Sequence, residues 1–287
     1  MFLPSAAFRA YNEKKRDGGI DVASLGFIGT GNMGSALARA ASKVENNTLL
    51  LANRHEDKAI RLSAELGCRV GSNIEAALCD YVILGVKPRG MGELIRSLRD
   101  VFEQRRHRQE PFVLVSMATG TSIKQVQNWA GDLYPVIRIM PNTPVTIGEG
   151  TILYCCSDNV TQAQEQGFLA AFEKSGLFVP LQESLIDAGS AISGCGPAFM
   201  CLILEAMADG AVACGLSRED AMRLSAQTMA GTAKYLLESG KHPGLVKDEV
   251  CSPGGTTIQG VRRLEQGSVR ADIMNAVIAA YEKNSNL

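Results

Sequence analysis

Three glycines in the pattern Gly-x-Gly-x-x-Gly constrain the fold of this 287-residue chain most strongly. Gly29, Gly31 and Gly34 follow an apolar segment typical of a strand and precede an alanine-rich segment typical of a helix. In that setting the glycines permit a tight turn, close approach of a pyrophosphate, and close helix–strand packing. The helix that Asn32 and Met33 open would offer free N–H groups to phosphates. The pattern predicts a dinucleotide-binding turn, with a glycine-rich turn that binds no ligand as the alternative.

Strand and helix patterns alternate through the first part of the chain. The expected strands are 25–28, 48–52, 81–86, 112–117, 136–140, 151–155 and 177–180, and the expected helices are 32–43, 57–66 and 165–174. Such alternation implies crossover connections and a mainly parallel sheet with both faces covered. We therefore expect an α/β fold with a Rossmann-like dinucleotide-binding domain.

After residue 181 the strand patterns end and long helical patterns follow, at 197–214, 218–238, 257–266 and 269–283. The first of these is apolar on nearly every side, so it must be buried on every side. A small helical domain has difficulty doing that alone, which suggests that a second subunit covers it. We expect an N-terminal extension (1–23), a Rossmann domain (24–181) and an all-helical dimerisation and substrate domain (182–287).

The composition of the chain limits which partners and which cellular compartment we expect. The net charge of −1 offers no basic excess for a polyphosphate backbone, so we do not expect nucleic acid as a partner. Eight scattered cysteines without a Cys-x-x-Cys pair, and only three histidines, indicate thiols in a reducing compartment and no metal site. Glu205 and Asp209 interrupt the longest apolar stretch, so no membrane span is expected. We expect a cytoplasmic protein whose first residues form a disordered tail, with a mitochondrial leader as the alternative.

The end of the second expected strand bears on the choice of cofactor. An acid there would bind the ribose 2′-hydroxyl of NAD, but this strand runs into Asn53, Arg54 and His55. An amide and a guanidinium suit a 2′-phosphate, so NADPH is favoured, with NADH as the alternative. Lys87, before Pro88 at another strand end, either approaches the cofactor or is an ordinary surface lysine.

A second glycine-rich turn lies near the C-terminus, at Pro253, Gly254 and Gly255. Two threonines follow it and open an expected helix. Backbone N–H groups at such a helix start form a site for a carboxylate. A threonine-capped helix after a Pro-Gly turn is an equal alternative on these residues alone.

Taken with its surroundings, this stretch closely resembles the pyrroline-5-carboxylate reductases. The resemblance covers about residues 25–283 and rests on Val-Cys-Ser-Pro-Gly-Gly-Thr-Thr-Ile (250–258), Ser-Gly-Cys-Gly-Pro-Ala (193–198), Met-Pro-Asn-Thr-Pro (140–144), Val-Lys-Pro (86–88) and the N-terminal glycines, in the family's order. Cys195 departs from the serine of many members. The resemblance implies reduction of L-1-pyrroline-5-carboxylate to L-proline by NADPH. It also implies a functional dimer or larger homo-oligomer, with the active site between the cofactor domain and a neighbouring subunit's helices.

The resemblance also implies roles for individual residues. Thr257 matches the threonine that hydrogen-bonds the ring nitrogen of the substrate, and Ser252, Gly255 and Thr256 match the loop that receives its carboxylate. The other matching positions are expected at the cofactor. They are Asn53, Arg54 and Asn73 near its adenosine end, Met140, Asn142 and Pro144 beside the nicotinamide, and Val86, Lys87, Pro88 and Thr119 at strand ends that face it.

Two other functions fit parts of the sequence. A β-hydroxyacid dehydrogenase would need a base in the helical domain, where Lys234 and Lys247 are the candidates, although neither lies in that family's motif. A non-catalytic NADPH sensor would bind the cofactor without turnover, but would have no need of the C-terminal threonine loop.

Overall fold

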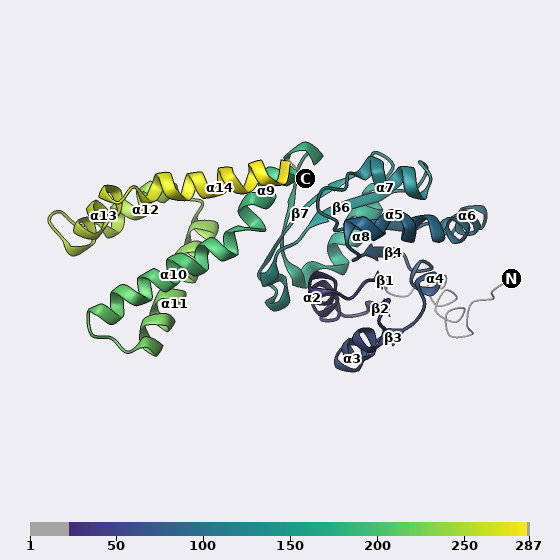
Figure 1. Ribbon diagram of the computed structural model, residues 1–287, viewed down its shortest axis with the longest axis horizontal. Helices are drawn as coiled ribbons and strands as arrows, with labels where there is room; N and C mark the ends of the chain where they lie inside the picture. Colours follow the sequence, from purple (N-terminus) through teal and green to yellow (C-terminus); the bar gives the residue numbers. More distant parts are fainter. Residues whose placement is uncertain (1–22, 286–287) are drawn as a thin grey trace. The chain divides into compact units, whose positions relative to one another are not determined.

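The computed structural model describes residues 23–285, and the chain divides into two compact units (Figure 1). The first ends at Gly194 and the second begins at Cys195. The expected extension, apart from Ala23, lies outside the described residues.

The first unit is built on one eight-stranded sheet. Its strand order is β3-β2-β1-β4-β5-β6-β7-β8. Strands β1 to β6 are mutually parallel, and β7 and β8 are parallel to each other but run opposite to the rest, with β7 antiparallel to β6. The strands are β1 (Ser24–Ile28), β2 (Thr48–Ala52), β3 (Arg69–Val70), β4 (Tyr81–Leu84), β5 (Val113–Ser116), β6 (Val136–Met140), β7 (Gly150–Cys156) and β8 (Gly176–Pro180). Strand order reverses at β1, which lies between β2 and β4. The carboxyl ends of β1 and β4 therefore form a topological switch point, where open α/β sheets bind ligands.

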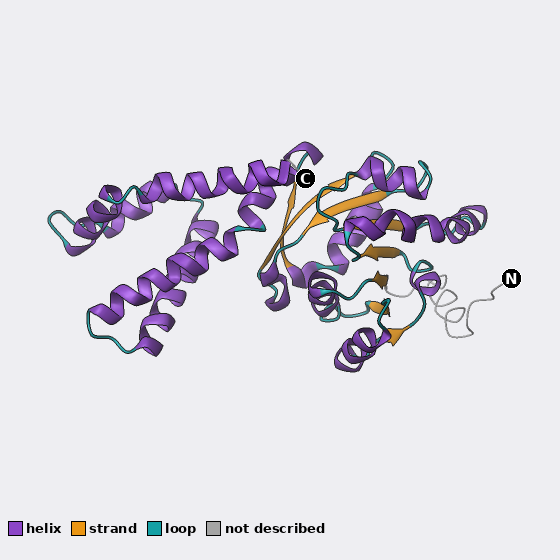
Figure 2. Cartoon of the chain, viewed as in Figure 1, coloured by secondary structure: helices purple, strands orange, loops and turns teal. Residues whose placement is uncertain are grey.

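Helices cover both faces of this sheet, as expected for a Rossmann-like fold (Figure 2). They are α2 (Asn32–Ala41), α3 (Glu56–Leu66), α4 (Asn73–Ala76), α5 (Pro88–Ser97), α6 (Arg99–His107), α7 (Ile123–Ala130), α8 (Gln162–Ala171) and α9 (Ile186–Ser193), with short 3-10 turns η1 (Thr143–Ile147), η2 (Glu173–Ser175) and η3 (Glu183–Leu185). The expected strands and the three expected helices are confirmed, with ends shifted by a few residues. Strand β3 and helices α4 to α7 and α9 were not expected.

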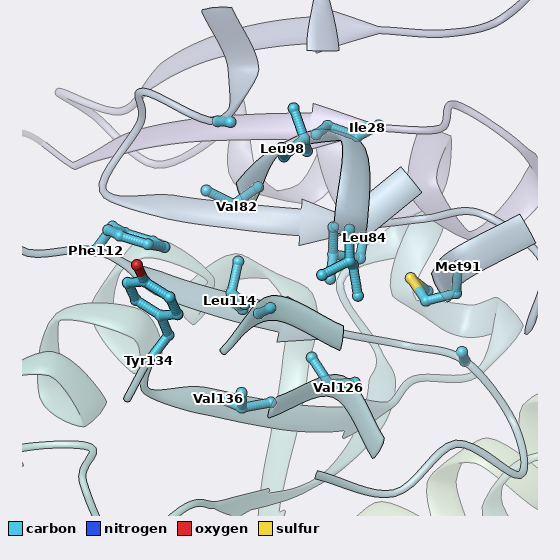
Figure 3. Close-up of a cluster of buried hydrophobic side chains, with 14 of the residues drawn as sticks. Ile28, Val82, Leu84, Met91, Leu98, Phe112, Leu114, Val126, Tyr134 and Val136 are labelled. Carbon is cyan, nitrogen blue, oxygen red and sulfur yellow. The ribbon is translucent and has the colours of Figure 1, made fainter. Parts of the chain in front are cut away.

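Two hydrophobic clusters lie on opposite faces of the sheet. In β4, Val82 belongs to one cluster and Ile83 to the other, because successive strand side chains point to opposite faces. The cluster that includes Val82, Leu84, Met91 and Phe102 packs under α4 to α7 and α9 (Figure 3). The cluster that includes Ile83 packs under α2, α3 and α8. Burying each large apolar side chain stabilises the fold by about 1.5–3 kcal/mol, so the sheet is a rigid base for its strand ends.

Helix α9 belongs to the first unit. Its Ile186 and Ala191 are buried, and a Cβ atom added at Gly189 would lie 2.7 Å from Leu153 Cδ1 of β7. This close packing explains why the first unit ends at Gly194, later than the boundary expected after residue 181.

The second unit is entirely helical (Figure 2). It contains α10 (Gly196–Ala213), α11 (Arg218–Ser239), α12 (Pro243–Val250), α13 (Thr256–Gln266) and α14 (Val269–Ser285). Of the side chains described in this unit, only Ala208, Ala221 and Ser225 are buried. The exposed large apolar side chains include Leu202, Met207, Leu224, Leu237, Leu264 and Met274. The unit therefore has no hydrophobic core of its own.

One helical stretch among the described residues, Glu183–Ala213, is long and apolar enough to cross a membrane by length and composition alone. The expectation of no span rested on Glu205 and Asp209, which interrupt the apolar part of this stretch. A protein partner could also cover such an apolar helix. We favour a protein partner, because the other helices of the second unit expose apolar side chains too.

Candidate functional site

The glycine turn lies at the switch point of the sheet. Gly29 has φ +105°, a conformation that favours glycine, and its N–H donates to Ala52 O of β2 at 2.8 Å. The N–H of Gly85, just after β4, donates to Ile28 O of β1 at 2.8 Å. The carboxyl ends of three strands are thus joined around the turn.

Steric contacts separate the roles of the glycines. A Cβ atom at Gly29 would lie 2.6 Å from Gly85 O, one at Gly85 would lie 2.4 Å from Gly29 O, and one at Gly34 would lie 2.2 Å from Gly29 O. These three positions tolerate no side chain because backbone meets backbone. A Cβ atom at Gly31 would meet nothing within 4 Å, so this glycine faces open space. Sequence reasoning missed Gly85, which lies inside the expected strand 81–86; a glycine within a strand pattern was a usable signal of close backbone approach.

Open space over Gly31 is where a dinucleotide's pyrophosphate would fit. Gly31 is the N-cap of α2, no side chain caps the helix, and its first turn carries no acidic residue. The N–H groups of Asn32 and Met33 precede the first intrahelical bond, from Ser35 N to Gly31 O. The turn therefore offers free donors and the positive end of the helix dipole to an anion.

Of the two residues after β2, Asn53 holds the glycine turn through hydrogen bonds, whereas the side chain of Arg54 is available to a ligand. Asn53 Oδ1 accepts from Thr30 N at 3.1 Å, and Asn53 Nδ2 donates to His55 O at 2.9 Å. Its amide therefore ties the end of β2 to the glycine turn. Arg54 is exposed and has no hydrogen bond or ion pair within the described part of the chain, so its guanidinium is available to a 2′-phosphate. Asn73 is exposed at the start of α4, directly after the capping serine Ser72.

Other sequence-predicted positions surround the same edge of the sheet. Lys87 is the N-cap of α5, Pro88 is its first residue, and both are exposed, while Val86 is half-buried. Thr119 is exposed in the turn that follows β5. Because β1, β4 and β5 are parallel neighbours, these residues and the glycine turn belong to one edge.

The end of β6 also lies at this edge. Met140 and Asn142 are both 7% exposed. The Asn142 side chain is engaged on both sides: its Oδ1 accepts from Thr151 N at 2.8 Å, and its Nδ2 donates to Ser193 O at 2.9 Å. The amide expected beside the nicotinamide thus joins β6, β7 and the end of α9.

A buried arginine that sequence reasoning missed lies on the same strand. Arg138 is 4% exposed, and its guanidinium contacts Glu183 at 3.2 Å and Asp187 at 3.3 Å. Glu183 also accepts from Ile123 N at 2.7 Å. An arginine within the apolar run Val-Ile-Arg-Ile-Met was the available signal, because a buried charge needs partners.

The C-terminal glycine loop belongs to the second unit. Ser252 O accepts from Gly255 N at 3.0 Å, and Gly254 has φ +71° after Pro253, the pattern of a type II turn. Gly255 is the N-cap of α13, and a Cβ atom there would lie 2.3 Å from Ser252 Oγ. No side chain caps α13, so the alternative of a threonine-capped helix is wrong. Thr256 and Thr257 open the helix with exposed side chains and leave its first N–H groups free for an anion.

Helix α12 (Pro243–Val250) directly precedes this loop in the chain and fixes its start. Lys241, before the helix, donates to Glu249 Oε1 near its end at 2.7 Å and to Tyr235 Oη at 3.0 Å. These bonds raise the pKa of Lys241, the one to Glu249 most strongly. The pairing ties both ends of α12 together directly before Cys251, where the loop begins.

A cavity in the first unit does not coincide with these residues. It has a volume of about 930 Å³, and its lining includes Ala23, Asn47, Asp80 and Phe112, each of which directly precedes a strand. It therefore lies at the amino edge of the sheet, opposite the glycine turn. Within residues 23–285, no group of three or more His, Cys, Asp or Glu side chains could hold a metal ion.

Comparison with known proteins finds a matching family model for each of the two units. Residues 183–287 match the family model described as pyrroline-5-carboxylate reductase dimerisation, and residues 24–120 match the one described as NADP oxidoreductase coenzyme F420-dependent. Pyrroline-5-carboxylate reductase from Arabidopsis thaliana is 38% identical over 271 residues, which cover 92% of this chain and 95% of the relative. The enzyme from Methanosarcina acetivorans is 37% identical, with 92% and 97% covered.

Solved structures agree in fold as well. The pyrroline-5-carboxylate reductase from Coxiella burnetii superposes with a TM-score of 0.85 at 29% identity, with 93% of this chain and 98% of that chain covered. The Plasmodium falciparum enzyme, solved with NADP bound, has a TM-score of 0.78 at 31% identity with the same coverage. Sequence relatives above one-third identity over nearly their whole length, together with this fold, show that the chain belongs to the pyrroline-5-carboxylate reductase family.

Proposed function

We propose that this chain reduces L-1-pyrroline-5-carboxylate to L-proline with NADPH, the last step of proline biosynthesis. Family membership supports the reaction, and the uncapped N-terminus of α13 is the observation that supports a carboxylate-bearing substrate most directly. Free N–H groups at a helix start are suited to a carboxylate. The solved relative with NADP bound supports the choice of cofactor.

The first unit would hold NADPH. Gly29, Gly31 and Gly34 with the first N–H groups of α2 would receive the pyrophosphate, and exposed Arg54, with Asn73 nearby, the 2′-phosphate. Strand-end residues Val86, Lys87, Pro88, Thr119 and Met140 would border the nicotinamide end. When bound, the cofactor supplies the hydride, so the protein itself needs no strong nucleophile.

The second unit would hold the substrate. Ser252, Gly255 and Thr256 would receive the carboxylate, which orients the ring. Thr257, on the same exposed helical turn, would place its hydroxyl at the ring nitrogen. A cyclic imine is already electrophilic, and the nitrogen gains electron density as its carbon accepts hydride. A hydroxyl held there stabilises that change of charge.

Self-association accompanies the proposed reaction. The second unit matches the family's dimerisation model and leaves its apolar side chains exposed, so it forms a homo-oligomer. The cytoplasm is the compartment we propose, with the mitochondrion as the alternative.

Loss of reduced-nicotinamide absorbance after adding pyrroline-5-carboxylate tests the proposal. We expect NADPH oxidation that depends on the imine, with proline as the product. A hydroxyacid that reduces NADP⁺ while the imine has no effect would indicate the β-hydroxyacid dehydrogenase instead. Tight NADPH binding without turnover of either substrate would indicate a sensor.

A further inference from the structure

We infer that Asn142 is a positioning residue that fixes the end of α9, the point from which the chain enters its substrate-binding unit. The sequence placed Asn142 at the nicotinamide. Its geometry points to a different task, because its amide bonds two backbone groups on other elements.

The contacts of Asn142 are specific and buried. Its Oδ1 accepts the Thr151 N–H at 2.8 Å, and its Nδ2 donates to Ser193 O at 2.9 Å. The side chain is 7% exposed, so water cannot replace either bond without rearrangement. An amide is needed here because one partner is a donor and the other is an acceptor.

The same strand holds the other end of α9. Arg138 contacts Asp187 in the first turn of the helix and Glu183 just before it. Strand β6 thus fixes the start of α9 through Arg138, and Asn142, two residues after the strand, fixes its end. Ser193 is followed by Gly194, the last residue of the first unit, so the bond to Asn142 lies directly before the boundary.

This arrangement predicts a particular kinetic pattern. Loss of the Asn142 bonds should leave the glycine turn and its affinity for the pyrophosphate intact, because that turn is held by β1, β2 and β4. It should impair use of the imine, because the end of α9 would be less well ordered at the point where the chain passes into the unit that carries Ser252 to Thr257. A direct contact between Asn142 and the nicotinamide predicts the reverse, a loss of NADPH affinity.

Asn142→Asp provides a test with a distinctive readout. Its ionised carboxylate can still accept from Thr151 N–H but repels Ser193 O. Its protonated form donates to Ser193 O as the amide does. Burial raises the pKa of such a carboxyl above the usual value of about 4. Relative to the unaltered protein, the variant should therefore recover kcat/KM for the imine as the pH falls.

The expected values separate the two roles. At pH above neutrality we expect kcat/KM for the imine to fall about 10- to 100-fold, as is typical when a buried polar group is left with an unfavourable partner. The Kd of NADPH, measured by fluorescence titration, should change less than about twofold, well below the effect of one lost hydrogen bond. Asn142→Ala should show the loss without recovery at low pH. Asn128→Asp, at an exposed position, should leave both constants unchanged.

Two results would overturn the inference: a selective loss of NADPH affinity in Asn142→Asp, or a constant activity ratio to the unaltered protein across the pH range. Hydrogen exchange on the unaltered protein covers the case of a variant that fails to fold. The Thr151 amide should then exchange as slowly as the centre of β7, and fast exchange would contradict the assigned bond. The test rests on the proposed function, whose own failure would appear separately as no imine-dependent oxidation by the unaltered protein.

Discussion

Two adjacent residues at the end of β2 have different tasks. Asn53 uses its amide to hold the glycine turn through Thr30 and His55, whereas Arg54 points its charge into solvent. The sequence assigned both to the cofactor from their chemical type. Which of them is free for a phosphate depends on local hydrogen bonds that the residue types do not reveal.

Replacing Arg54 with alanine should change the cofactor preference. The guanidinium would pair with a 2′-phosphate that NADH lacks, and a charge-assisted bond contributes about 1.5–3 kcal/mol. We expect KM for NADPH to rise about 10- to 100-fold and KM for NADH to stay constant. Lys58→Ala, which removes an exposed charge from the adjoining helix α3, is the control. An unchanged KM for NADPH would remove Arg54 from the cofactor site.

Thr257 can be tested with a substitution that preserves its shape. Thr257→Val removes the hydroxyl, so kcat should fall about 100-fold, the scale on which a transition-state donor contributes, with the Kd of NADPH unchanged. Thr257→Ser keeps the hydroxyl and should retain most of the turnover. Steady-state kinetics with pyrroline-5-carboxylate gives both values. Full turnover by the valine variant would exclude the proposed role.

At the scale of elements, α6 shows what a sequence pattern conceals. The run Arg105, Arg106, His107, Arg108 is typical of a solvated helix end, and for Arg105 that expectation is wrong. Its guanidinium is buried and donates to Ala77 O at 2.8 Å, Cys79 O at 2.6 Å and Pro111 O at 3.0 Å. Burial lowers the pKa of Arg105 to about 10. The helix is thus fixed to the segments that lead into β4 and β5.

Arg105→Lys should therefore destabilise the fold, although it keeps the charge. A lysine cannot reach three carbonyls in the same plane. We expect the free energy of unfolding in urea to fall by about 2–4 kcal/mol, the scale for breaking a buried charged network. Arg106→Lys is a matched control, because Arg106 is exposed and forms an ion pair with Glu103 on the helix surface. Equal stability of the two variants would contradict the anchoring role.

Gly255→Ala tests the loop before α13. The added Cβ atom would lie 2.3 Å from Ser252 Oγ, so Ser252 must move. We expect KM for the imine to rise about tenfold or more, as when a substrate-orienting contact is lost, with the Kd of NADPH unchanged. Gly260→Ala, in the middle of α13 with nothing within 4 Å of an added Cβ atom, should leave KM unchanged. A similar effect from both alanines would mean that the loop geometry is not required.

The sequence predicted strands better than the helices between them. Continuous apolar runs such as Tyr-Val-Ile-Leu identify buried parallel strands directly. Helices α5 to α7 were missed although each is amphipathic, so their 3.6-residue periodicity was an available signal. Candidate residues around the glycine turn were found because spacing alone identifies that motif. Arg138 and the true bonds of Asn142 were not, because their partners lie 45 or more residues away along the chain, except for Thr151.

For the whole molecule, the two units differ in how they bury their apolar side chains, and this difference indicates self-association. The first has two hydrophobic clusters, and the second exposes apolar side chains along α10, α11, α13 and α14. An all-round apolar helix in the sequence had already indicated a second subunit. The exposed positions are now identified individually.

Leu202→Glu should weaken self-association. Leu202 is 70% exposed on α10, and a charge forced into an apolar interface is strongly unfavourable. Sedimentation velocity should show a shift from oligomer to monomer at the same chain concentration. Leu133→Glu, at a 64% exposed apolar position of the first unit, is the control and should leave the oligomer intact. An intact oligomer with Leu202→Glu would place the interface on other helices.

The missing core of the second unit also has a consequence for how activity arises in a dilute solution. A single newly made chain can complete the hydrophobic clusters of its first unit alone, but the second unit, which we propose binds the substrate, acquires a dry interior only after an encounter with another chain. Specific activity should therefore fall on dilution below the dissociation constant of the oligomer, and recovery on concentration should follow second-order kinetics. The active form is therefore populated by mass action, with a second copy of the chain in the role of a stabilising ligand.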